Sequence, residues 1–141
     1  KHLGYDEEVD ARDYKEWCEL FGVKELTYSH EEQMIKPSMI KNFPNDTSPF
    51  WNMKQNGDGT AAKIDVILGG METIGSAERS SNPEEMREMF HTISDGMYAK
   101  LLYSQFGKER VEKELEDFLS LDFIPRVGGG IGITRLISAI M

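Results

Sequence analysis

The spacing of apolar side chains predicts four helical segments in this chain of 141 residues. Apolar residues recur every three or four positions, as on one helical face, in residues 11–21, 83–104, 108–120 and from about 133 onward. Asp10 is the expected N-cap of the first helix, and Gly22 suits its end. The second helix begins at Asn82-Pro83-Glu84-Glu85, which places a cap, a proline and two acids in the order that helix starts favour.

Alternating apolar and polar positions predict strands between these helices. Residues 38–43, before Pro44, and residues 62–68 have this pattern, and residues 50–54 are expected to be extended. Asn56-Gly57-Asp58-Gly59 is a strong turn signal that suits a hairpin. Residues 23–37 are polar and mixed, so a loop is expected there. Strands of the antiparallel kind together with separate helices predict an α+β fold.

The charge balance narrows the possible functions. Sixteen basic residues face 25 acidic ones, a net charge of −9, which argues against a free-standing nucleic-acid binder. A nucleotide enzyme is still compatible, because Mg²⁺ can bridge carboxylates to phosphates. The single cysteine, Cys18, excludes an intramolecular disulfide framework and a cysteine-based zinc site. With apolar runs far shorter than a bilayer needs, we expect a cytoplasmic protein and no membrane partner.

The first candidate for chemistry is a set of charged residues at regular spacing. Asp65, Glu72 and Arg79 are each seven positions apart, and glycines interrupt the segment. Side chains seven apart in an extended strand point to opposite faces unless a bulge intervenes, and the glycines could supply one. Two carboxylates suit Mg²⁺, and a guanidinium suits a carboxylate or phosphate. The alternative is a turn with ordinary surface charges.

The second candidate is a glycine-rich segment before the last helix, Gly128-Gly129-Gly130-Ile131-Gly132, followed by Arg135. It matches neither the Rossmann fingerprint nor the P-loop. Glycines before a helix let the backbone approach a ligand, and Arg135 could reach a phosphate or stack on a base. The alternative is a strand that packs closely on a helix.

These segments together resemble the catalytic domain of class II aminoacyl-tRNA synthetases, in the aspartyl, asparaginyl and lysyl branch. Residues 128–136 resemble motif 3 of that class, and residues 65–79 resemble the segment ahead of it. Residues 39–44 and 49–53 are similar to the paired active-site strands of the branch. The resemblance implies an antiparallel sheet flanked by helices.

The resemblance also implies a role for each matching residue. Arg135 would contact ATP, Asp65 and Glu72 would hold Mg²⁺ on the triphosphate, and Arg79 would pair with the side chain of the amino acid. Ser76 is assigned to the same amino-acid substrate, and Gly128, Gly130 and Gly132 to the floor under the nucleotide. The amino-acid carboxylate would attack the α-phosphorus of ATP and give an aminoacyl-adenylate, a reaction that depends on positioning and charge neutralisation.

Several parts of the complete enzymes have no match in this chain. Motif 1, motif 2 and an anticodon-binding barrel are missing, and Arg126-Val127 stands where many relatives have aromatic or Ala-Phe residues. The chain also lacks an initial Met and ends within an apolar helical pattern. We therefore expect residues 1–141 to be the C-terminal part of a catalytic domain. It would be inactive alone and would belong to a homodimeric parent that acts on tRNA.

Two alternatives keep the same fold. One is an asparagine-synthetase-like ligase, in which ammonia captures the aspartyl-adenylate. The other is a non-catalytic paralogue. The sequence leaves aspartate against asparagine open. Lysine is disfavoured because Arg79 would repel its side chain, although Glu72 and Glu78 keep it as an alternative.

Overall fold

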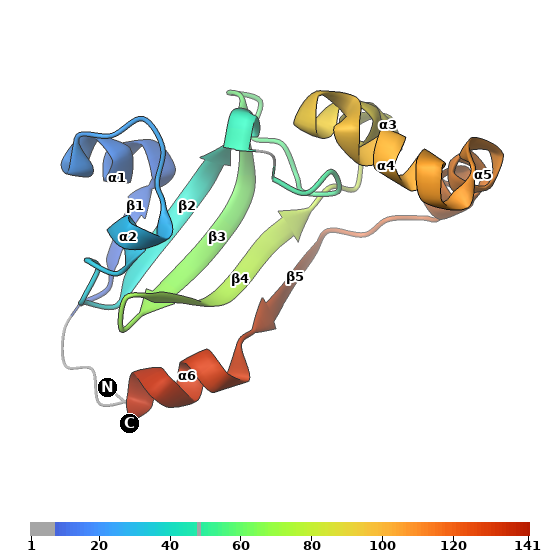
Figure 1. Cartoon of the computed structure of the whole chain (residues 1–141). Coiled ribbons are helices and arrows are strands. Elements are labelled where there is room, and N and C mark those ends of the chain that lie inside the picture. Colours follow the sequence, from blue (N-terminus) through green and yellow to red (C-terminus); the bar gives the residue numbers. More distant parts are fainter. Residues whose placement is uncertain (1–7, 48) are drawn as a thin grey trace.

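Five strands form a single sheet in which every strand lies beside its neighbours in the sequence (Figure 1). The computed structural model describes residues 8–47 and 49–141. The strands are β1 (Asp10–Asp13), β2 (Ser38–Pro44), β3 (Thr60–Leu68), β4 (Met71–Arg79) and β5 (Arg126–Ile131). Only β1 and β2 are parallel, and the other pairs are antiparallel. The predicted α+β class with a largely antiparallel sheet is confirmed.

The helices lie in separate groups around this sheet (Figure 1). Near β1 and β2 lie α1 (Tyr14–Phe21) and the short α2 (Tyr28–Glu31). Beyond the end of β4 lie α3 (Pro83–Thr92), α4 (Met97–Phe106) and α5 (Lys108–Leu119), whereas α6 (Ile133–Ile140) follows β5. Two short 3₁₀ helices, η1 (Asn45–Thr47) and η2 (Ile93–Gly96), complete the elements. None of the helices in residues 8–47 and 49–141 is both long and apolar enough to cross a membrane.

The start of the first helix differs from the prediction. The helix begins at Tyr14, and its N-cap is Asp13 rather than Asp10. Residues 10–13 instead pair with β2 as a strand, because the hydrogen bonds of the sheet edge compete successfully for them. The backbone N–H of Asp13 donates to Glu16 Oε2 at 2.7 Å, and Asp-x-x-Glu is a sequence signal for this cap. Gly22 ends the helix in the left-handed conformation, as predicted.

Two further predictions need correction in the loops before β3. Residues 23–37 contain α2 and are not a loop throughout. Residues 50–54 do not form a regular strand, because they contribute only an isolated bridge between Met53 and Arg79. This irregular segment nevertheless carries Trp51 into the helical core and Asn52 to the end of β4.

The described residues form two larger core clusters, one at each of two helix groups, and a small cluster of Met53, Ala61 and Ala77 on the sheet. Beside β2, α1 packs on one face of the sheet, and the indole N–H of Trp17 donates to Met39 O at 2.9 Å. Around α3, α4 and α5 a second cluster forms against Trp51. The first cluster contains Tyr14, Trp17, Cys18, Met34, Ile40, Phe43 and Ile67, and the second contains Met86, Phe90, Ala99, Val111, Leu115 and Leu119.

Candidate active site

A β-bulge brings the seven-residue series onto one face of the sheet. In the ladder between β3 and β4, Val66 pairs with Ile74 but Ile67 pairs with Glu72, so Thr73 is an extra residue. An extra residue reverses the alternation of side chains along a strand. Glu72 therefore projects from the same face as Asp65 and Arg79. The bulge that the spacing required is present.

Asp65 and Glu72 meet above a glycine. Asp65 pairs with Gly75 in the ladder, and a Cβ at Gly75 would lie 2.8 Å from Glu72 Oε1 and 3.5 Å from Asp65 Oδ1. Only glycine leaves room for both carboxylates. Asp65 is 5% exposed, and its Oδ1 atom has no hydrogen-bond partner among the described residues. A buried, unpaired carboxylate oxygen beside a second carboxylate favours a cation at this place.

The groups around Asp65 shift its pKa in opposite directions. Burial raises the pKa of Asp65, Glu72 adds to that rise, and the ion pair with Lys63 counteracts it. The Lys63 ammonium also lies 3.8 Å from the centre of the Phe43 ring. Burial and the two nearby carboxylates likewise raise the pKa of Glu31 on α2. The site thus concentrates negative charge that a bound cation would relieve.

Arg135 lies beside this carboxylate pair. Its Nη1 atom donates to the backbone oxygen of Glu72 at 2.8 Å, and the Gly132 N–H donates to Thr73 O at 2.9 Å. The bulge therefore also fixes the start of α6. Arg135 and Glu72 line a pocket of about 200 Å³ together with Glu31, and Glu31, Asp65 and Glu72 line an adjoining one of about 470 Å³.

Small residues of β4 and β5 form the floor beside this pocket. Gly75 pairs with Gly130, and Ala77 pairs with Gly128. A Cβ at Gly128 would lie 3.0 Å from Arg79 Nε, so the guanidinium group of Arg79 passes directly over this glycine. The structure thus brings Gly128 and Gly130 to the face that carries Asp65 and Arg79. Gly132 lies one turn away, at the N-terminus of α6.

Neutral groups alone orient Arg79. Its Nη1 atom donates to Asn52 Oδ1 at 3.1 Å, and Nη2 donates to Gly128 O at 3.4 Å. No carboxylate in the described part of the chain forms an ion pair with it. Asn52 was missed by the sequence reasoning, because it lies in an irregular segment whose contact with β4 has no periodic signal.

Ser76 is the predicted site residue that the structure does not bring together with the others. It pairs with Ile64 and Gly129, and its hydroxyl donates to Ile64 O at 3.3 Å. Since alternate residues of a strand face opposite ways, Ser76 projects from the face opposite to Gly75 and Arg79. A direct side-chain contact of Ser76 with a ligand above Gly75 is therefore not supported.

The described residues contain no group of three or more His, Cys, Asp or Glu side chains that could hold a metal ion. Mg²⁺, however, is usually bound by one or two carboxylates together with substrate phosphates and water. The pair of Asp65 and Glu72 fits that pattern, whereas it does not fit a metal held by the protein alone.

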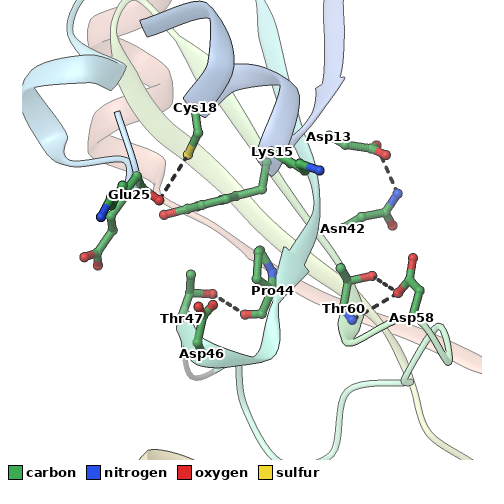
Figure 2. Close-up of a pocket in the computed structure, with 12 residues that line it drawn as sticks. Asp13, Lys15, Cys18, Glu25, Asn42, Pro44, Asp46, Thr47, Asp58 and Thr60 are labelled. Carbon is green, nitrogen blue, oxygen red and sulfur yellow. Dashed lines mark hydrogen bonds between the residues drawn. The ribbon is translucent and has the colours of Figure 1, made fainter. Parts of the chain in front are cut away.

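A further pocket of about 460 Å³ lies beside α1, where Lys15 and Cys18 of this helix and Asn42 of β2 line it (Figure 2). It shares Tyr14, Glu25 and Thr47 with the pocket that contains Asp65. Its walls are held by local hydrogen bonds, such as Thr47 Oγ1 to Pro44 O at 2.7 Å. It therefore extends the candidate site, and its lining mixes acidic and basic groups without a distinct ligand set.

Comparisons with known proteins identify the family of this chain. The family model for class II tRNA synthetases (D, K and N) matches residues 3–141. An asparagine–tRNA ligase from Aliivibrio fischeri is 29% identical over 140 residues, which are 98% of this chain and 26% of that protein. The chain thus spans about a quarter of the length of such relatives.

Solved structures share the fold at low identity. The aspartyl-tRNA synthetase of Entamoeba histolytica matches with a TM-score of 0.69 and 19% identity, over 94% of this chain and 28% of that one. The asparaginyl-tRNA synthetase of Pyrococcus horikoshii, complexed with asparaginyl-adenylate, matches with 0.67 and 18%, over 94% and 31%. The five-stranded sheet with its flanking helices is the fold of class II tRNA synthetases. This chain belongs to the class II tRNA synthetase family of the aspartate, lysine and asparagine type.

Proposed function

We propose that this chain supplies the ATP- and amino-acid-binding part of a catalytic domain that activates aspartate or asparagine and transfers it to tRNA. The observation that carries the proposal is the bulge that places Asp65, Glu72 and Arg79 on one face, with Arg135 beside Glu72. The adenylate bound to the Pyrococcus horikoshii relative supports the same reaction.

Each residue of the candidate site would have its own role. Arg135 would bind the nucleotide above the glycines of β5, and Arg79 would bind the side chain of the amino acid. Asp65 and Glu72 would hold Mg²⁺, which when bound neutralises phosphate charge. The amino-acid carboxylate attacks the α-phosphorus, and pyrophosphate leaves. Because no covalent nucleophile is needed, catalysis rests on orientation and electrostatic stabilisation.

The decisive experiment is ATP–pyrophosphate exchange by the parent chain with aspartate, asparagine or lysine. Exchange with aspartate or asparagine is expected, and none with any amino acid contradicts an enzymatic role. The 141-residue chain alone is expected to be inactive, because it spans about a quarter of the length of its relatives. We place the parent in the cytoplasm as a homodimer, and size-exclusion chromatography of the parent tests the dimer.

Arg79→Ala provides a residue-level test. Loss of the guanidinium group would leave the polar side chain of the substrate unpaired, so amino-acid binding should weaken by more than about 1.5 kcal/mol. Calorimetric titration of the parent chain measures this. Unchanged binding removes Arg79 from the site.

The acceptor of the adenylate distinguishes tRNA transfer from amide synthesis. Incubation of the adenylate-forming enzyme with tRNA should give aminoacyl-tRNA. Free asparagine formed from aspartate and ammonia would overturn the tRNA assignment.

A further inference from the structure

Arg79 and Arg126 lie directly opposite each other in the ladder between β4 and β5. Directly opposed residues of an antiparallel pair project from the same face, with Cβ atoms about 5 Å apart. Like charges at such positions destabilise a sheet. The fold therefore places two arginines side by side, at the end of the face that carries the candidate site.

Neither guanidinium group is neutralised within the described residues. Arg126 Nη1 donates to the backbone oxygens of Ser80 at 3.1 Å and Ile124 at 3.4 Å, and its guanidinium carbon lies 4.7 Å from the Phe123 ring centre. Carbonyls and an aromatic face orient the group but leave its net charge intact. In contrast, the arginines outside this face pair with carboxylates: Arg12 with Asp10, Arg87 with Glu84 and Glu116, and Arg110 with Glu114.

We propose that Arg79 and Arg126 together bind the side-chain carboxylate of the substrate, so that the site selects aspartate over asparagine. This deepens the proposed function and rests on it. A carboxylate offers two charged acceptor oxygens to two donor groups and cancels one of the two positive charges. An amide offers one neutral oxygen and turns an NH₂ donor toward groups that only donate. The difference favours the acid and disfavours the amide.

Asn52 has a defined part in this arrangement. Its neutral Oδ1 atom holds Arg79 without an opposing charge. Asn52→Asp has nearly the same shape but would supply an internal carboxylate that competes with the substrate for Arg79. This substitution should therefore lower aspartate affinity more than asparagine affinity.

Calorimetric titration of the parent chain with L-aspartate and L-asparagine, in the presence of Mg²⁺ and a non-hydrolysable ATP analogue, tests the proposal. The unmodified chain should bind aspartate about tenfold more tightly or better, the effect of one charged hydrogen bond. Arg126→Gln should remove most of that preference by weakening aspartate binding, and Arg126→Lys should retain part of it. In exchange kinetics, Arg126→Gln should raise KM for aspartate with little change in kcat.

Arg110→Gln is the matched control, since it makes the same chemical change on the exposed face of α5. Its aspartate preference should equal that of the unmodified chain. If Arg126→Gln does not fold, Asn52→Asp provides the test in its place. A preference for asparagine in the unmodified chain, no aspartate binding, or a ratio unaffected by both variants overturns the inference.

The outcomes separate this inference from the proposed function. Aspartate binding that depends on Arg126, without exchange with any amino acid, contradicts the proposed function and supports the two-arginine site. ATP–pyrophosphate exchange that proceeds best with asparagine and is unchanged in Arg126→Gln supports the proposed function and contradicts the two-arginine site.

Discussion

At the scale of single residues, Gly75 determines whether the two candidate metal ligands can meet. A Cβ in Gly75→Ala would lie 2.8 Å from Glu72 Oε1, the end of a flexible side chain that can turn aside. We expect a stability loss below about 1 kcal/mol, since a mobile group yields without backbone strain. Displacing Glu72 should weaken Mg²⁺-dependent ATP binding by the parent chain about tenfold. Urea denaturation and nucleotide titration at several Mg²⁺ concentrations measure the two effects.

Gly129→Ala is the matched comparison on the opposite face. Its Cβ would lie 2.7 Å from the backbone oxygen of Gly75 and 2.8 Å from Ser76 Cβ. Because backbone cannot turn aside, this variant should lose about 1–3 kcal/mol of stability. Equal stability losses in the two variants would contradict the argument that only the flexible end of Glu72 has to move for a Cβ at Gly75.

The sequence could predict some residues of the candidate site but not others. The spacing of Asp65, Glu72 and Arg79 indicated a shared face only if a bulge existed, and the ladder contains that bulge. Asn52 and Arg126 could not be found in the same way. Their proximity to Arg79 depends on the register of segments 27 and 47 positions away in the sequence, and periodicity reports only on local geometry.

At the scale of elements, the predicted helix over 83–104 is two helices that meet at a tight corner. Ser94 and Asp95 have φ values of 53° and 54°, and Gly96 follows with 74°. The apolar spacing continued across the break, so periodicity gave no sign of it, although Gly96 is compatible with such a corner. The apolar spacing favours a continuous helix through residues 94–96, but the packing of α4 against α3 and α5 in the second core cluster stabilises the corner.

This corner makes a stabilising substitution predictable. A non-glycine residue in the left-handed region carries a cost of about 1 kcal/mol, which Asp95→Gly removes. The unfolded chain of this variant becomes more flexible, which offsets most of that gain, so the net gain should be at most about 0.6 kcal/mol. Lys100→Gly, at an exposed position within α4, should instead lose about 1 kcal/mol. Urea denaturation compares both, and a loss in Asp95→Gly similar to that in Lys100→Gly would contradict strain at residue 95.

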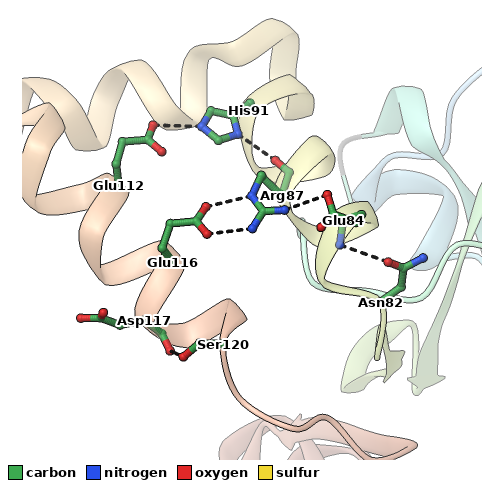
Figure 3. A network of polar contacts seen from close by, with 8 residues as sticks. All are labelled: Asn82, Glu84, Arg87, His91, Glu112, Glu116, Asp117 and Ser120. Carbon is green, nitrogen blue, oxygen red and sulfur yellow. Dashed lines mark hydrogen bonds and ion pairs between the residues drawn. The ribbon is translucent and has the colours of Figure 1, made fainter.

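Helices α3 and α5 are joined by a charge network that depends on pH (Figure 3). His91 Nδ1 lies 2.8 Å from Arg87 O, and Nε2 lies 2.9 Å from Glu112 Oε1. Both neighbours accept hydrogen bonds, so both ring nitrogens must donate, which corresponds to the imidazolium form. Burial lowers the pKa of His91, but the hydrogen bonds to Glu112 and Arg87 outweigh it, and the pKa is raised above 6.5.

The direction of the pH effect follows from these shifts. The His91 contribution is fully present below pH 6.5 and is lost as pH rises through its raised pKa in the folded state. Hydrogen bonds from Tyr103 and His91 lower the pKa of Glu112 below 4.5, so its contribution is lost only as pH falls through that lower value. Burial and the bond to Glu112 raise the pKa of Tyr103 to about 12, so its hydroxyl remains a donor throughout.

His91→Gln tests this network, because glutamine can donate a hydrogen bond but carries no charge. The unmodified chain should melt about 3 °C higher than the variant near pH 5.5, since a partly exposed pair is worth up to about 1 kcal/mol. The difference should shrink as pH is raised through the His91 pKa. Calorimetric scans across this range measure it. A constant difference would mean that packing rather than charge is responsible.

At the scale of the whole molecule, the two sides of the sheet are used differently. On one side α1, α2 and the candidate site cover the strands, with Ile40, Phe43 and Ile67 buried. On the other side lies the cross-strand set of Val66, Ile74 and Ile131, in which Ile131 is 54% exposed. The sequence predicted the alternation along residues 62–68, which contain Val66 and Ile67, but the cover over each face is a property of tertiary packing.

Helix α6 also exposes apolar side chains, and we predict that this surface causes the chain to self-associate. Within the described structure three isoleucines at helical spacing face outward: Ile133, Ile137 and Ile140, with 62%, 48% and 46% exposed. Contiguous apolar surface of this kind drives self-association in water. We therefore expect the 141-residue chain to associate reversibly as its concentration rises, as measured by sedimentation velocity.

The double variant Ile133→Gln, Ile137→Gln should remain monomeric and lose less than about 1 kcal/mol of stability, because these side chains are already largely solvated. Leu20→Gln, at an equally exposed position on α1 (57%), is the control that should associate like the unmodified chain. Association that persists in the double variant, or that disappears equally in the control, would show that α6 is not the surface responsible.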